Sequence, residues 1–100
     1  MLWAISRVTK PNTTAAREAL LETHRAYLQT QKRILVLSGA LQNDEGTEGI
    51  GSLLIVNVNS RAEAQAFVDG DPMTQGGFFT SITLTRMRKG QWNPAAIEGA

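Results

Sequence analysis

Two residues of this chain could exchange protons at neutral pH. One is the only histidine, His24, and the other is Asp71, which stands between Gly70 and Pro72. An imidazole has an ordinary pKa of about 6.5 and can therefore accept or donate a proton under physiological conditions. A carboxylate beside it would orient the ring and favour its charged form. The two residue types therefore indicate general acid–base chemistry if the fold brings them together.

The neighbours of Asp71 restrict its backbone. Gly70 is a natural C-terminal cap for a helix, because glycine can adopt a positive φ without a Cβ penalty. Pro72 disfavours the α region for the residue before it, so we expect an extended Asp71 whose side chain lies off the helix axis. Aspartate is also common in turns, so a role as a helix stop alone stays open. Asp69 is a weaker rival for the site.

The segment around His24 has the period of a helix, over about residues 13–33. The residues on its predicted inward stripe are Ala16, Leu20, His24, Tyr27, Leu28 and Gln31. A histidine on such a stripe can also be a core residue that only bonds a neighbour, because buried polar groups usually find a partner. The helix therefore directs His24 inward, where a structural role and a chemical role are both open.

Ser38 is a third polar residue, and it could line a cavity together with His24 and Asp71. It precedes Gly39 in the apolar segment 34–41, which we interpret as a buried strand. Its hydroxyl could instead bond to the backbone or the sheet edge. A hydrolase triad of Ser38, His24 and Asp71 is not favoured, because no nucleophile elbow or oxyanion motif surrounds the serine.

The composition limits the classes of protein that this chain could represent. Its 100 residues fit one domain, and the hydrophobic fraction of 42% is that of a globular protein. A net charge of +1 gives no basic surface for nucleic acid. Without cysteine and with one histidine, disulfides and a zinc site of several histidines or cysteines are excluded within one chain. We therefore expect neither a metal nor a cofactor.

The hydropathy pattern predicts no targeting segment. No apolar run approaches the roughly 18 residues that a membrane span needs, and the start "MLWAISRVTK" lacks the features of a signal peptide. The expectation is a cytoplasmic protein without a membrane partner.

The periodicity predicts the element order β-α-β-β-α-β. The expected elements are strand 2–9, helix 13–33, strand 34–41, strand 51–58, helix 60–69 and strand 78–88. Ser60 and Glu63 form a capping box at the start of the second helix. The tail, about 93–100, is expected to be flexible, with Trp92 before it as an anchor. This order is typical of an α+β, ferredoxin-like βαββαβ sandwich with both helices on one face of the sheet.

The strands carry apolar residues on both faces, so a second layer is needed. We assign Trp3, Ile5, Leu53, Ile55, Phe79 and Met87 to one face. Because an exposed apolar face of this size usually marks an interface, we expect a second copy to cover it. The predicted homodimer would be built on residues such as Trp3, Ile5 and Phe79.

Several short segments resemble one known family. They are the early aromatic Trp3, "HRAYL" at 24–28, "LSG" at 37–39 and "SRAEAQAFVDGDP" at 60–72, followed by a glycine before the last strand. In these segments the chain resembles the YCII-related (YciI-like) family, small proteins of the dimeric α+β barrel type, over roughly residues 1–92. Two positions depart from the family pattern: Met73 stands where members often have an aromatic, and Ala40 where they often have proline. Both positions border the expected pocket.

The resemblance implies a single YCII-like domain over 1–100 with a histidine and an aspartate facing one cavity. By position these are His24 and Asp71, with Ser38, Tyr27 and Met73 as further lining residues. A few relatives eliminate chloride from chlorinated aromatic-degradation intermediates, and most members have no assigned activity. The resemblance therefore implies a small, cofactor-independent lyase or isomerase acting on such an intermediate or on a small organic acid.

Two other functions stay open. The first is a non-catalytic dimer that binds a small ligand in the same cavity or docks another protein. The second is a cofactor-free oxygenase of the antibiotic-monooxygenase type, which shares the barrel but would need a reactive, electron-rich substrate. Fold alone does not decide among these functions.

Overall fold

The computed structural model describes residues 1–100 and contains the six predicted elements in the predicted order. The strands are β1 (Leu2–Thr9), β2 (Leu35–Gln42), β3 (Gly49–Asn57) and β4 (Phe79–Met87). The helices are α1 (Thr14–Thr30), α2 (Arg61–Gly70), a short α3 (Pro72–Gln75) and the 3-10 turn η1 (Pro94–Ile97). The sequence did not predict α3 or η1.

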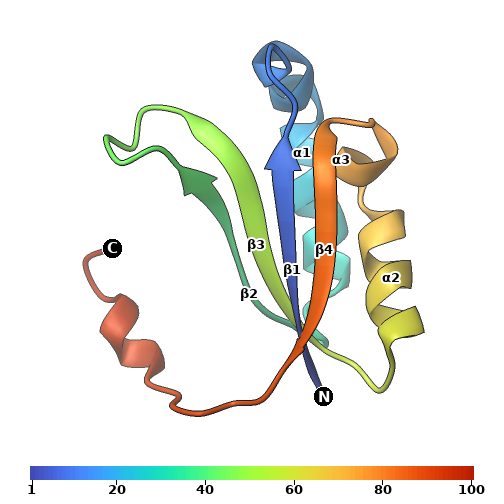
Figure 1. Ribbon diagram of the computed structural model, residues 1–100, viewed down its shortest axis with the longest axis vertical. Helices are drawn as coiled ribbons and strands as arrows, with labels where there is room; N and C mark the ends of the chain where they lie inside the picture. The colour runs from blue at the N-terminus through green and yellow to red at the C-terminus, as the bar shows by residue number, and fades with distance from the viewer.

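The four strands form one antiparallel sheet in the order β2-β3-β1-β4. Helices α1, α2 and α3 all lie on the same side of this sheet (Figure 1). The α+β, ferredoxin-like arrangement predicted from the element order is therefore confirmed. Because β1 lies in the centre, residues on its helix side are covered by neighbouring strands as well as by helices.

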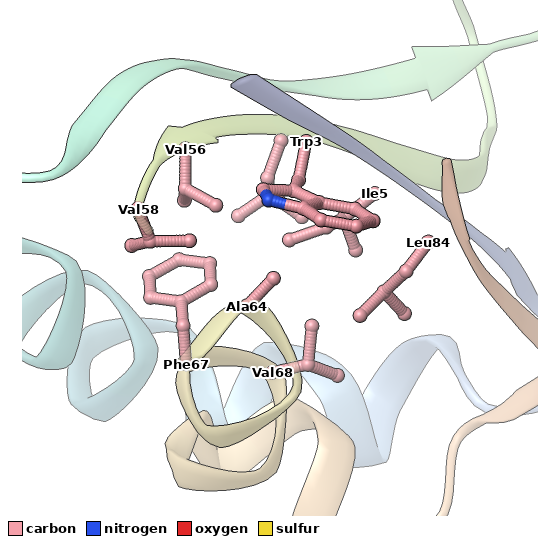
Figure 2. Close-up of a cluster of buried hydrophobic side chains, with 9 residues drawn as sticks. Trp3, Ile5, Val56, Val58, Ala64, Phe67, Val68 and Leu84 are labelled. Atoms are coloured by element: carbon pink, nitrogen blue, oxygen red, sulfur yellow. The ribbon is translucent and has the colours of Figure 1, made fainter. Parts of the chain in front are cut away.

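The core lies between the sheet and α2 (Figure 2). Trp3 and Ile5 point into it and are 8% and 0% exposed. They pair with Val56 and Leu54 on β3, which face the same way. The assignment of Trp3 and Ile5 to the uncovered face was therefore wrong. Alternation shows which residues of one strand share a face, but it does not show how two strands are aligned.

The uncovered face is apolar, as predicted, but it is made of different residues. Leu53 and Ile55 of β3 lie on it, opposite Ser6 and Ala4 of β1. Its most exposed apolar side chains are Val8, Leu37, Leu41 and Met87. Of the six residues that were assigned to this face, Leu53, Ile55 and Met87 belong there. Phe79 does not, because a register shift beside Thr9 turns its ring beneath Arg7 on the helix side.

The prediction that the segment 34–41 is a buried strand was half wrong. It forms β2, but β2 is an edge strand whose residues are mostly exposed. Val36 and Leu37 are 38% and 41% exposed. An apolar run usually marks a strand that is covered on both faces, so in the single chain β2 has the composition of a covered strand without the cover.

The two longer helices depart from the sequence expectation in small ways. Helix α1 ends at Thr30, and Ala16 is exposed on it rather than inward. Helix α2 begins as predicted, with the Ser60 hydroxyl accepting from the Glu63 amide at 3.1 Å. The Glu63 carboxylate accepts from the Asn59 amide, one residue earlier than a regular capping box would have it.

Gly70 is not the left-handed cap that we expected. It lies inside α2, and its φ is not positive. Glycine stands here because Tyr27 leaves no room for a side chain: a Cβ at residue 70 would lie 2.6 Å from the Tyr27 hydroxyl oxygen. Helix α2 ends because Asp71 is extended, at φ −74° and ψ 125°, as the proline after it predicts.

The C-terminal segment stands apart from the sheet and the helices (Figure 1). We expected Trp92 to anchor the tail. It is 56% exposed, so it does not do so in the single chain. None of the helices combines the length and the hydropathy that a membrane-spanning segment needs.

Candidate functional site

His24 and Asp71 lie in contact. The distance from His24 Nδ1 to Asp71 Oδ1 is 2.8 Å, within the hydrogen-bond range expected for this pair. His24 comes from the middle of α1, and Asp71 from the junction of α2 and α3, two segments that are separated by 47 residues in sequence. The His24 side chain is 15% exposed and that of Asp71 only 1%, so the ring reaches the solvent and the carboxylate is buried.

The junction of α2 and α3 holds the Asp71 carboxylate in place. Asp71 has an extended backbone and is the N-cap of α3, and its Oδ1 accepts from the Met73 amide at 3.0 Å. Its other oxygen, Oδ2, accepts from Arg7 Nη1 at 2.7 Å. Both carboxylate oxygens are therefore occupied. Asp71 is a helix cap and a partner of His24 at the same time, which unites the two roles that its sequence position suggested.

Arg7 is the residue that sequence reasoning missed. It is 2% exposed, in the centre of the sheet on β1. Its Nη1 also donates to Thr74 Oγ1 at 3.1 Å, and its Nε donates to Ser52 Oγ at 2.8 Å. Its guanidinium carbon lies 4.4 Å from the centre of the Phe79 ring, a cation–π contact. The signal was present: Arg7 continues the alternation of Trp3 and Ile5, which marks it as pointing inward.

The electrostatics of the site keep Asp71 ionised. Burial by itself raises the pKa of this carboxyl. The hydrogen bonds from His24, the Met73 amide and Arg7, together with the Arg7 charge, outweigh that effect and hold the Asp71 pKa below its ordinary value. Because the carboxylate is ionised at neutral pH, the proton between the two groups sits on His24 Nδ1, which donates it. The other ring nitrogen, Nε2, is then the one that can accept a proton.

Tyr27 responds to the same charge. Burial raises the pKa of the Tyr27 hydroxyl, and the negative Asp71 raises it further. That hydroxyl donates to the Phe67 carbonyl at 2.7 Å and therefore serves the packing of α1 against α2.

A cavity of about 360 Å³ adjoins His24, between α1 and strands β2 and β3. It is lined by Leu21, His24, Arg25, Leu28, Ser38, Gly39, Ala40, Ser52 and Leu54. Asp71 is not among these residues. The expectation that both members of the pair open onto a cavity is therefore met by His24 alone, because the Asp71 carboxylate is buried.

The predicted lining residues divide among several hollows. Ser38 lines the His24 cavity. Tyr27 lines a hollow beside Phe67, and Met73 lines one beside Arg17 and Glu48. Ser52, which sequence reasoning did not consider, joins Ser38 and His24. No group of three or more His, Asp or Glu side chains is arranged to hold a metal ion.

Comparison with known proteins gives one family and one structure of particular interest. The model of the family described as YCII-related domain matches residues 1–88. A dehydrochlorinase for 5-chloro-2-hydroxyhydroquinone from Burkholderia phenoliruptrix, solved in complex with 2,5-dihydroxybenzoquinone, has a similar structure. The TM-score is 0.81 and the identity is 29%, over 90% of this chain and 96% of that one. No curated protein sequence gives a significant match.

Proposed function

This chain belongs to the YCII-related domain family, and on that premise we propose that it is a small enzyme of lyase or isomerase type. In this proposal His24 exchanges a proton with a small organic acid or a chlorinated, hydroxylated aromatic intermediate, without a cofactor. The observation that carries the proposal is the contact of 2.8 Å between His24 Nδ1 and a buried Asp71, with the histidine ring on the wall of a cavity.

The chemistry follows from which atoms are free. Asp71 holds the ring through Nδ1 and is fully engaged by Arg7 and the Met73 amide, so it does not exchange protons itself. His24 Nε2 is the base. In the elimination of HCl from the keto tautomer of the substrate, the carbon that carries chlorine is tetrahedral. The base takes a proton from an O–H or C–H bond, and the electron pair of that bond forms a new C=O or C=C bond. The C–Cl bond breaks as the double bonds shift, and the chloride leaves with its electron pair.

The cavity supports a small substrate. Its volume of about 360 Å³ is near the lower end of the 300–1,000 Å³ that is usual for ligand sites. Leucine side chains give it apolar walls, and Ser38 and Ser52 add hydroxyl groups beside His24. A single substituted ring with several oxygen atoms suits both the size and the polarity. The ligand in the similar dehydrochlorinase, 2,5-dihydroxybenzoquinone, is a molecule of this kind.

The test is turnover of a chlorinated hydroxyhydroquinone, followed by chloride release. In His24→Asn the amide can still donate to Asp71, but the residue has no ring nitrogen that accepts a proton. We expect this variant to keep its fold and to lose about 10²–10⁴-fold in turnover, the usual contribution of general acid–base catalysis. Folded wild-type protein that releases no chloride, or an Asn variant as active as wild type, would contradict the proposal.

The alternative is a non-catalytic protein that binds a small ligand in the same cavity. The specific observation that favours it is the complete engagement of Asp71, which a purely structural carboxylate would also show. Binding of 2,5-dihydroxybenzoquinone without turnover of any chlorinated relative would select this alternative.

We also propose that a second copy of the chain covers the open face of the sheet. Val8, Leu37, Leu41 and Met87 are 37–47% exposed there, and Leu53 and Ile55 lie among them. Burying such a face removes apolar area from water, which stabilises the complex by about 25 cal/mol per Å² of buried apolar surface. In an isologous contact each chain presents the same surface to the other, so the open face of one chain can cover the open face of its partner.

A further inference from the structure

Four side chains form one continuous series of hydrogen bonds across the candidate site. His24 bonds to Asp71 at 2.8 Å, Asp71 accepts from Arg7 at 2.7 Å, and Arg7 donates to Ser52 at 2.8 Å. The two central members are 2% and 1% exposed, whereas both ends, His24 and Ser52, line the same cavity. The buried ion pair therefore connects two groups that face one ligand.

The Ser52 hydroxyl is held in one hydrogen-bonding role. A serine oxygen can accept two hydrogen bonds and donate one. Here the oxygen accepts from the positively charged Arg7, and no hydrogen bond within the chain uses the hydroxyl as a donor. The cation beside the oxygen polarises the O–H bond and makes it a better donor. Its hydrogen is therefore available to an acceptor in the cavity.

We propose that Ser52 binds the substrate by donating this hydrogen to one of its oxygen atoms, while His24 exchanges a proton at a second position. The inference rests on the proposed function and narrows its substrate class. The ligand would be a small planar molecule with a carbonyl or ionised hydroxyl oxygen for Ser52, in addition to the proton that His24 takes. A hydroxyquinone has both features. An aromatic hydrocarbon or a halobenzene without oxygen does not, and it would leave the polarised hydroxyl unpaired.

Thr74 provides a matched control for this role. Its hydroxyl accepts from the same guanidinium at 3.1 Å, as Ser52 does from Nε, but Thr74 does not line the His24 cavity. If Ser52 served only to hold Arg7, removing either hydroxyl would have similar consequences. If Ser52 binds the ligand, only its own removal weakens binding.

The experiment measures the dissociation constant of 2,5-dihydroxybenzoquinone for the full chain and three variants. We expect Ser52→Ala to bind about tenfold more weakly, as the loss of one hydrogen bond to a charged oxygen implies. Ser52→Thr, which keeps the hydroxyl, should bind within about threefold of wild type, and so should Thr74→Val. Unfolding midpoints measured on the same samples show whether each variant is folded.

The outcomes separate this inference from the proposed function. Wild type that binds while Ser52→Ala binds equally well overturns the role of Ser52 and leaves the proposed function standing. Equal weakening in Ser52→Ala and Thr74→Val also overturns it, because the hydroxyl would then act only through Arg7. Absence of binding to the folded wild type contradicts both.

Discussion

Arg7 Nη1 lies 2.7 Å from Asp71 Oδ2, and neither side chain reaches the solvent. This ion pair joins the centre of the sheet to the junction of α2 and α3. The same pair therefore belongs both to the candidate site and to the buried interior of the fold. A buried ion pair is not strong evidence of net stabilisation, because taking two charges out of water is costly. Removing one partner is different, since it leaves the other charge buried without compensation.

Replacing Asp71 should therefore destabilise the fold as well as the site. In Asp71→Asn the side chain keeps its size, but Arg7 stays charged at 2% exposure without a counter-ion. We expect the free energy of unfolding to fall by about 3–5 kcal/mol. Urea denaturation measures the change. Asp69→Asn is the control, since this residue is exposed and its carboxylate bonds only Gln65, and it should change stability by less than about 0.5 kcal/mol. Equal stability of the two variants would contradict the prediction.

Acid should destabilise the protein through the same carboxylate. The folded state holds the Asp71 pKa below its ordinary value of 3.8, so the unfolded chain takes up this proton first as the pH falls. The stabilisation from Asp71 is complete above about pH 4 and is lost as the pH drops through the folded-state pKa. We expect the difference in free energy of unfolding between wild type and Asp71→Asn to be constant near neutral pH and to narrow below about pH 4. A difference that stays constant down to pH 2 would show that the carboxylate is not held in its ionised form.

The position of Asp71 could be predicted from the sequence because local rules set it. Pro72 disfavours the helical conformation at the residue before it, and the helical period turns His24 inward. Arg7 could not be assigned a partner in the same way. Alternation indicates that it points inward, but the carboxylate that neutralises it is 64 residues away. A long-range pair of this kind depends on how the strands and helices are packed together.

The wrong assignment of Trp3 and Ile5 has one cause. Each strand was identified, yet Trp3 and Ile5 were grouped with Leu53 and Ile55 instead of with Leu54 and Val56. A shift of one residue in register moves every side chain of a strand to the other face, and the sequence of one strand contains no information on its alignment with the next. The expectation that Trp3 and Ile5 lie at the interface was wrong for this reason, whereas Phe79 was misplaced because of the register shift beside Thr9. An uncovered apolar face does exist.

The proposed dimer can be tested at positions on the open face that are exposed in the single chain and therefore add little to its stability. Leu37 is 41% exposed on β2, so Leu37→Lys should leave the fold of one chain intact. In a dimer it would bury an unpaired charge, and we expect it to favour the monomer. Sedimentation equilibrium should give twice the chain mass of 10.9 kDa for wild type and the single mass for the variant. Ala16→Lys, on the exposed side of α1, is the control and should remain dimeric. Wild type that sediments at the single mass at micromolar concentration would rule out the second copy.

Gly70 is required by the contact between α1 and α2 and not by its backbone conformation. A Cβ at this position would lie 2.6 Å from the Tyr27 hydroxyl oxygen and 3.0 Å from its Cζ. Alanine favours a helix over glycine by about 1 kcal/mol, whereas overpacking costs about 1–3 kcal/mol. The displaced hydroxyl would also lose its bond of 2.7 Å to the Phe67 carbonyl. We therefore expect Gly70→Ala to lower the free energy of unfolding by about 1 kcal/mol or more.

A double-mutant cycle with Tyr27→Phe separates the clash from other effects of Gly70→Ala. Phenylalanine removes the oxygen that comes closest, so Gly70→Ala should cost less in that background, although the ring carbons at 3.0 and 3.1 Å still resist the methyl group. Gly90→Ala is the control, because a Cβ there meets nothing within 4 Å, and it should change stability by less than about 0.5 kcal/mol. If Gly70→Ala stabilises the protein in both backgrounds, helix propensity outweighs the contact with Tyr27, and the packing explanation of this glycine is wrong.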